Sequence, residues 1–161
     1  MKSAEKIIQQ FDLQPLPREG GWFRQTYLLQ EANDNARATA IFFLLRDEMP
    51  TQLHRLASDE IFHAYAGDPV EILILEEDKS PSTRILGNPI HHPQAIPQLV
   101  IRGGTWQAAR LLKSEYGFSL MGTTMCPGFC WDSFEEGDIE IFMKTFPDNS
   151  DLFRPYVRSI H

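Results

Sequence analysis

The first apolar positions of the chain recur at helical spacing, at Ala4, Ile7, Ile8 and Phe11. This spacing predicts a short amphipathic helix near the N-terminus, with Ser3 as its N-cap. The prolines and glycines of LQPLPREGG follow, and residues of these types end helices.

From Gly21 to Met125 the pattern changes to short runs typical of β-strands. The clearest runs are aromatic-rich, β-branched or continuously apolar: Gly21–Leu29, Ala38–Arg46, Ile61–Ala66 and Val70–Glu77. The turn tripeptide GDP separates the last two runs, so we expect them to form a hairpin. Short strands at regular spacing, with turn residues between them, predict a mainly β sandwich or small barrel.

Helical spacing returns near the C-terminus, at Ile139, Phe142, Met143 and Phe146. We expect a helix there that follows an Asp138 N-cap and ends at Pro147, and then a last short helix. The chain is therefore expected to form one domain over residues 1–161, mainly β, with a short N-terminal helix and C-terminal helices.

Composition narrows the class of protein. With 161 residues, 42% of them hydrophobic, and a net charge of −7, the chain is typical of a soluble globular domain. It has no basic cluster and no long apolar run, so we expect neither a nucleic-acid partner nor a membrane span. The N-terminus lacks the pattern of a signal peptide, which favours a cytoplasmic location. Cys126 and Cys130 are expected to be ordinary thiols, although a disulfide or a metal role stays open.

Candidate chemistry concentrates in HRLASDEIFHAYAG, residues 54–67, and in RGGTWQ further along the chain. His54, Glu60, Gly67 and Gly104 occupy positions similar to those of the two sequence motifs of cupins. Such proteins typically bind a metal ion through three His and one Glu. None of the common motifs for serine hydrolases, P-loops, dinucleotide binding or zinc proteases occurs.

The cupin pattern is incomplete at three positions. Leu56 stands where the first motif has its second His, Gln107 where the second motif has its His, and Arg102 where that motif has Pro. By the resemblance, His54, Glu60 and Gln107 are the candidate metal ligands. A glutamine is a weak neutral ligand and a leucine is none, so we expect either no cofactor or a weakly held divalent metal. The favoured alternative is a metal-free pocket with a hydrogen-bonded His54–Glu60 pair.

Longer blocks carry a closer resemblance. EGGWFRQTY, SDEIFHAYAGDPVEILIL, WQAAR and CPGF occur in this order, from about Glu19 to Phe134. On these blocks the chain is identified as a member of the Cupin_5 or DUF985 group, a family without a generally established biochemical function. The resemblance implies a cupin double-stranded β-helix (jelly roll) and a homodimer. Strands such as ILIL and IFFLL are apolar on both faces, as expected where a second sheet or subunit packs against them.

Three further residues are candidates with open alternatives. Strand alternation places His63 and Tyr65 on the face opposite Glu60, toward solvent or a subunit interface. A β-bulge would bring them back, so His63 stays a catalytic candidate and Tyr65 a ligand contact. Arg24 would bind a carboxylate or phosphate of a ligand, or else form a structural salt bridge. Gln107 is expected to line the pocket, with partners for both ends of its amide.

Two functional hypotheses follow. The implied fold is shared with metal-free sugar-nucleotide epimerases and sugar isomerases, so the first hypothesis is an isomerase- or epimerase-like enzyme. His54 would be its base, Glu60 the residue that orients His54, and Gln107 with Arg24 the substrate contacts. The second hypothesis is a non-catalytic module that binds a sugar, nucleotide or carboxylate. A metal-dependent oxygenase is disfavoured because two of the usual ligands are missing.

Overall fold

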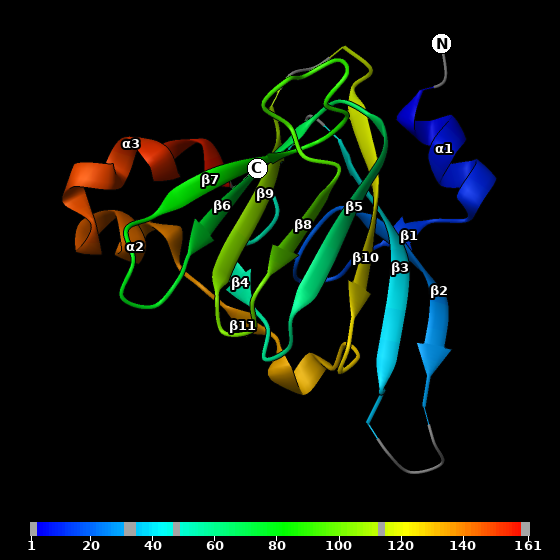
Figure 1. The fold of residues 1–161 in the computed structure, drawn as a ribbon, viewed down its shortest axis with the longest axis horizontal. Helices are drawn as coiled ribbons and strands as arrows, with labels where there is room; N and C mark the ends of the chain where they lie inside the picture. Colours follow the sequence, from blue (N-terminus) through cyan, green and yellow to red (C-terminus); the bar gives the residue numbers. More distant parts are fainter. Residues whose placement is uncertain (1–2, 31–34, 47–48, 113–114, 159–161) are drawn as a thin grey trace.

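The computed structural model describes residues 3–30, 35–46, 49–112 and 115–158 and shows two antiparallel β-sheets (Figure 1). The six-stranded sheet contains, in spatial order, β1 (Gln14–Pro15), β2 (Trp22–Leu29), β3 (Ala38–Arg46), β10 (Phe118–Met125), β5 (Glu60–Gly67) and β8 (Gln98–Ile101). The five-stranded sheet contains β11 (Glu135–Glu136), β4 (His54–Arg55), β9 (Trp106–Leu111), β6 (Val70–Leu75) and β7 (Ser82–Leu86). This arrangement confirms the mainly β, jelly-roll architecture expected from the sequence.

The helices lie where the helical spacing predicted them. They are α1 (Ala4–Phe11), α2 (Ile139–Thr145) and α3 (Ser150–Phe153), with the short 3-10 helices η1 (Trp131–Ser133), η2 (Pro147–Asn149) and η3 (Arg154–Tyr156). Ser3 precedes α1 but makes no side-chain capping bond, whereas the Asp138 side chain accepts one from the Glu140 N–H at 2.8 Å. Within the described ranges, no helix is long and apolar enough to cross a membrane.

The hairpin expected between β5 and β6 is wrong. β5 pairs with β10 and β8, whereas β6 pairs with β9 and β7, so the turn carries the chain from one sheet to the other. Gly67 has a φ of +96°, and a Cβ there would lie 2.2 Å from the Phe118 carbonyl oxygen. The buried Asp68 carboxylate accepts bonds from the backbone N–H groups of residues 115–117 at 2.8–3.0 Å. These long-range contacts, which a turn-type tripeptide does not reveal, direct the chain into the second sheet.

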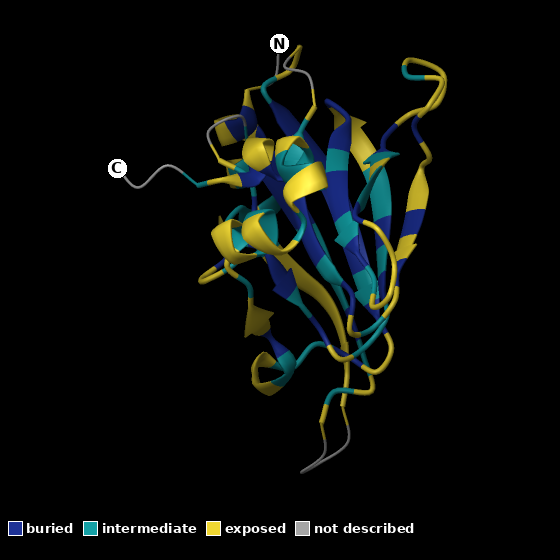
Figure 2. Cartoon of the chain, turned by 90° about the vertical axis from the view of Figure 1, so that its left-hand side faces the viewer, coloured by how far each residue is buried: buried dark blue, intermediate teal, exposed yellow. Residues whose placement is uncertain are grey.

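The main hydrophobic core lies between the two sheets, and helices cover parts of their outer faces. α1 packs on the six-stranded sheet against Leu44 and Leu120. The C-terminal helices cover the five-stranded sheet, where Phe153 packs with Leu73. Figure 2, viewed from the side of these helices, shows their exposed outer surfaces and the buried strand positions behind them. The two outer faces are therefore partly covered by helices, and the inner faces of the sheets enclose the main core.

Candidate functional site

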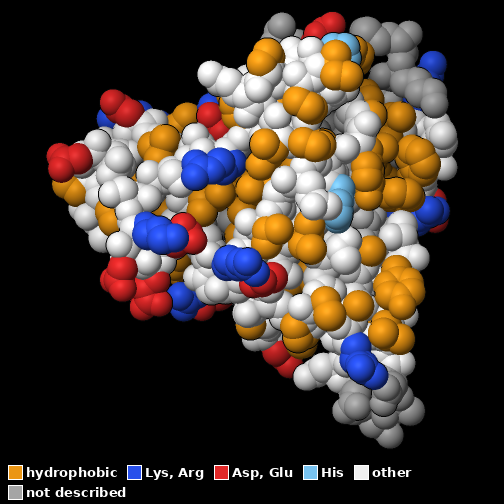
Figure 3. Space-filling model, viewed as in Figure 1, with side chains coloured by type: hydrophobic (Ala, Val, Ile, Leu, Met, Phe, Trp, Pro, Cys, Tyr) orange, Lys and Arg blue, Asp and Glu red, His pale blue; other side chains and the backbone are white. Residues whose placement is uncertain are grey.

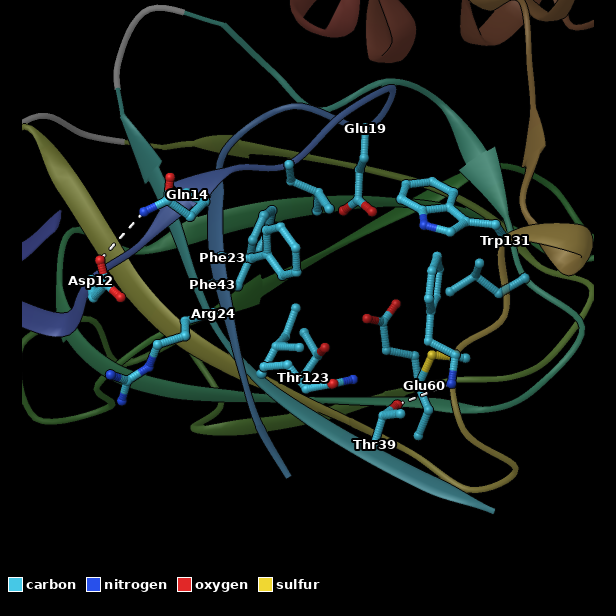
Figure 4. A pocket seen from close by; sticks show the side chains of 16 residues that line it. Asp12, Gln14, Glu19, Phe23, Arg24, Thr39, Phe43, Glu60, Thr123 and Trp131 are labelled. Atoms are coloured by element: carbon cyan, nitrogen blue, oxygen red, sulfur yellow. Dashed lines mark hydrogen bonds between the residues drawn. The ribbon is translucent and has the colours of Figure 1, made fainter. Parts of the chain in front are cut away.

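A cavity of about 440 Å³ lies against the six-stranded sheet, and β1, β2, β3, β5 and β10 all contribute to its wall (Figure 4). Its wall is mostly apolar and includes Phe23, Ile41, Phe43, Leu56, Met125 and Phe129. Three acidic residues, Asp12, Glu19 and Glu60, also line it, and the carboxyl groups of Glu19 and Glu60 point into the same space from different elements. Carboxyl groups in mostly apolar surroundings are costly to ionise, so this is the part of the molecule where altered acid–base behaviour is expected.

Glu60 begins β5 and is buried, with 8% of the residue exposed. Its Oε2 accepts a hydrogen bond from the Gln107 amide at 2.8 Å, which bridges the two sheets, and Thr123 provides a second hydrogen bond. Desolvation, followed by the nearby charge of Glu19, raises the pKa of Glu60 to about 7, against the lowering effects of His54 and the two hydrogen bonds. Glu60 can therefore gain or lose a proton near neutral pH.

Glu19 lies in the loop between β1 and β2, and sequence reasoning missed it as a site residue. Burial raises the pKa of this carboxyl group to about 8, although 14% of the side chain is exposed. Its position depends on the two following glycines, Gly20 and Gly21, which have φ values of +94° and +77°. A Cβ on Gly21 would also lie 2.7 Å from the Phe43 ring. In the sequence, Glu19 is marked only by the Gly-Gly pair that follows it. That pattern does not predict a buried acid, because the other residues of the cavity wall are distant in sequence.

His54 lies behind the two acids and does not itself line the cavity. Its Nδ1 donates to the Gln52 carbonyl at 2.8 Å, and its ring stacks on Phe134 with centroids 5.0 Å apart. Because a carbonyl only accepts, Nε2 is left as the acceptor nitrogen. This buried atom has no hydrogen-bond partner among the described residues and lies 3.9 Å from the Glu19 Oε2. Burial lowers the pKa of His54, which favours the neutral ring.

The other predicted polar residue of this group, Gln107, is paired with His54 in the β4–β9 register. It is buried and contacts Glu60, but it is not among the cavity-lining residues. His54 is oriented by its hydrogen bond to the Gln52 carbonyl, and the Glu60 carboxyl group is hydrogen-bonded by Gln107 and Thr123. The structure thus brings the three predicted residues together without the expected His54–Glu60 hydrogen bond.

Arg24 reaches the edge of the cavity through β2 but does not face the acids. In Figure 4 its guanidinium group points away from Glu19 and Glu60. The guanidinium carbon lies 5.5 Å from the centroid of the Phe42 ring. The geometry therefore does not place this positive charge where a ligand between the two acids would meet it.

His63 and Tyr65 lie on the outer face of β5, away from the cavity. The His63 ring nitrogens lie 3.2 Å from the Thr124 hydroxyl and 3.2 Å from the Gln98 amide, and its ring stacks with Tyr65 at 6.4 Å. A register irregularity does occur, but it leaves Tyr65 unpaired, beyond His63 in the strand. The bulge therefore does not turn His63 inward, and strand alternation holds between Glu60 and His63.

The potential ligand side chains in the described residues do not form a cupin-type metal site. No three His, Cys, Asp or Glu side chains in the described ranges are placed to hold a metal ion together. Gln107 turns its amide nitrogen toward Glu60 and so presents a donor rather than a ligand oxygen. Leu56, at the position of the second cupin His, contributes only an apolar surface. Cys126 and Cys130 are free thiols and do not add to the set.

Comparison with solved structures places the fold among cupins. A protein of Shewanella oneidensis, solved by X-ray crystallography, superposes with a TM-score of 0.87 at 27% identity, over 99% of this chain and 100% of that chain. A hypothetical protein from Leishmania major gives 0.82 at 22% identity, over 98% and 100%. Oxalate decarboxylase from Bacillus subtilis gives 0.59 at 14% identity, over 88% of this chain but 37% of that one, and shows a likeness of fold alone.

No curated protein sequence matches the chain significantly. The sequence does match the profile of the family described as Cupin superfamily (DUF985), over residues 5–136, which includes Glu19, His54, Glu60 and Gln107. The chain belongs to the DUF985 family of the cupin superfamily.

Proposed function

We propose that the protein is an isomerase- or epimerase-like enzyme that moves a proton next to a carbonyl group of a small molecule. One observation carries this proposal: Glu19 and Glu60 face a single apolar cavity with pKa values raised to about 8 and about 7. General acids and bases work best when their pKa lies near the working pH. A pair of carboxyl groups whose surroundings separate their pKa values can supply one base and one acid together.

The roles follow from the surroundings of the two groups, because hydrogen bonds from Gln107 and Thr123 lower the pKa of Glu60, whereas burial alone acts on Glu19 and raises its pKa. Near pH 7.5, the group with the lower pKa, Glu60, is the better base and removes the proton from the carbon next to the carbonyl. Glu19, still mostly protonated, donates its proton to the carbonyl oxygen, which yields an enol. Return of a proton to carbon, with loss of the enol proton to Glu19, completes an isomerisation or epimerisation without net change in the protein. His54 is a positioning residue, because its neutral Nε2 lies beside Glu19 rather than in the cavity.

A non-catalytic binding module is the second candidate, favoured by the apolar cavity wall. Aromatic and aliphatic side chains such as Phe23, Phe43 and Met125 would bind an apolar ligand whether or not it reacts. This candidate predicts binding without exchange of any carbon-bound proton, so one experiment separates the two functions.

The proposed assembly is a homodimer formed through the outer face of the six-stranded sheet. Tyr65 on β5 and Val100 on the neighbouring β8 are 54% and 44% exposed there. In Figure 3, hydrophobic side chains are more numerous on the right, where Figure 1 shows the six-stranded sheet. Charged side chains gather over the half with the C-terminal helices. Exposed apolar surface of this kind supports an interaction face.

The test of the proposed function is proton exchange in D2O. The purified protein is incubated with a panel of small ketones, aldehydes and sugars, and NMR follows the loss of protons next to each carbonyl. The proposal predicts exchange for at least one compound, reduced by about 100-fold or more in Glu60→Gln. The same substitution at the exposed Glu77 is the matched control and should leave the rate unchanged. Binding without exchange across the panel would support the binding module instead.

A further inference from the structure

The charge of the cavity restricts what can enter it. Of the described residues that line the cavity, Arg24 alone is basic, and its guanidinium group points away from the acids. Arg18, the neighbour of Glu19 in sequence, donates to the Glu136 carboxylate at 2.7 Å and lies 4.7 Å from the centroid of the Phe134 ring. Both arginines are thus engaged elsewhere, and no described cation faces the pair of carboxyl groups.

The carboxyl group of Glu19 is the group most available to a ligand. It accepts no hydrogen bond from the described residues, and the His54 Nε2 lies 3.9 Å from its Oε2, too far for a hydrogen bond. Glu60, by contrast, is already held by Gln107. A ligand atom placed between the two acids would therefore meet a hydroxyl donor when Glu19 is protonated and a negative charge when it is not.

The remaining wall is suited to an apolar body. Phe23, Phe43 and Phe129 contribute aromatic rings, and Ile41 and Met125 contribute aliphatic surface. The volume of about 440 Å³ lies toward the small end of the usual range for small-molecule pockets, roughly 300–1,000 Å³. A compact ligand with one polar end fits this distribution better than a ligand that is polar along its whole length.

We propose that the cavity accepts a compact uncharged carbonyl compound with an apolar body and rejects carboxylates and phosphates. This inference rests on the proposed proton-transfer function, because it identifies the substrate class of the same site. A carbonyl oxygen can accept a hydrogen bond from the Glu19 carboxyl group, whereas an anion would lie beside two acids without a compensating cation. The sugar nucleotides and carboxylates considered from sequence are thereby disfavoured as ligands.

The test uses three ligands with one apolar body and different charges: phenylacetone (uncharged), phenylacetate (anionic) and 2-phenylethylamine (cationic). Calorimetry or ligand-observed NMR at pH 6.5 measures their affinities for the full-length protein. The proposal predicts that phenylacetone binds at least about 10-fold more tightly than phenylacetate. At pH 9, where Glu19 is ionised, Glu19→Gln should shrink this ratio, because one source of negative charge is gone, whereas the matched control Glu77→Gln should keep the wild-type ratio.

Several outcomes would overturn the inference. They are equal or tighter binding of phenylacetate, tighter binding of the amine than of the ketone, and no binding of phenylacetone at millimolar concentration. A lower affinity for phenylacetate in Arg24→Gln would also count against it, because the guanidinium group would then serve the cavity. Following the α-protons of phenylacetone in D2O separates this inference from the proposed function. Tighter binding of phenylacetone without proton exchange would support the substrate class and contradict catalysis. Proton exchange together with tighter binding of phenylacetate would support catalysis and contradict the substrate class.

Discussion

The two faces of β5 carry similar chemical groups under opposite conditions. On the inner face, Glu60 is buried beside a second acid, and the neighbouring His54 has a ring nitrogen without a described partner. On the outer face, both ring nitrogens of His63 have hydrogen-bonding neighbours, the Thr124 hydroxyl and the Gln98 amide. Unmet hydrogen bonds and costly charges therefore mark the candidate site, rather than the presence of a histidine.

The largest expected effect is the difference in reaction rate between a substitution on the inner face of β5 and one on its outer face. Glu60→Gln should reduce the rate of proton exchange by about 100-fold or more, because the base is removed while the shape of the side chain is kept. His63→Gln should change the rate by less than about twofold, since its ring contacts neither the cavity nor the acids. NMR exchange rates measured under identical conditions check both. A comparable loss in the two variants would remove the distinction between the faces.

A second prediction concerns stability against pH. The pKa of Glu19 is raised to about 8 in the folded protein, from an ordinary value of 4.5, so the folded state holds an extra proton between these pH values. Its contribution to the free energy of unfolding is therefore most favourable below about pH 4.5 and is lost as the pH rises to about 8. Each pKa unit corresponds to about 1.4 kcal/mol, but partial exposure of Glu19 reduces the effect, so we expect about 2 kcal/mol.

Urea unfolding of wild type and Glu19→Gln at pH 5 and pH 9 measures this contribution. The variant should gain about 2 kcal/mol relative to wild type between the two pH values, because glutamine does not ionise. Glu77→Gln is the matched control and should run parallel to wild type. If the difference between Glu19→Gln and wild type is the same at both pH values, the raised pKa of Glu19 is wrong.

A smaller effect is expected at His54. The protonated form of His54 lowers the pKa of Glu60, so His54→Gln should move the rising limb of the pH–rate profile slightly to higher pH; the shift is small because burial keeps the ring mostly neutral. The rate at the optimum should fall by no more than about 10-fold, because His54 does not line the cavity. A shifted limb indicates a positioning role. An unshifted profile with a rate loss as large as that of Glu60→Gln would make His54 the base instead.

The smallest effect on chemistry is expected on the outer face. Tyr65→Arg places a charge in the proposed dimer interface and should weaken self-association by about 10-fold or more while leaving the cavity unchanged. Light scattering over a concentration series measures the change. A wild-type protein that is monomeric at all accessible concentrations would contradict the dimer itself.

Local patterns in the sequence predicted much of the fold. Apolar spacing located α1 and α2, and the bounds of β3 agree with the predicted run Ala38–Arg46. The β5–β6 hairpin failed because a turn is local, whereas the contacts of Gly67 and Asp68 with the segment near Phe118 that direct it are distant in sequence.

The site was predicted less completely. Motif similarity located His54, Glu60 and Gln107, and the structure brings them together. It did not identify Glu19, because that acid acquires its environment only when the β1–β2 loop closes over the cavity. The direction of the Arg24 side chain could not be predicted from its apolar neighbours in sequence either, since it depends on which face of β2 turns inward.

The most direct test of the account is an NMR titration of the glutamate side-chain carboxyl carbons in wild type, Glu19→Gln and Glu60→Gln. We predict two carboxyl groups that titrate near pH 7 and pH 8, one absent from each variant. We also expect the two carboxyl groups to titrate as a coupled pair, so that removing one of them lowers the pKa of the other. If both groups titrate near their ordinary value of 4.5, the cavity is not an acid–base site and the proposed chemistry is contradicted.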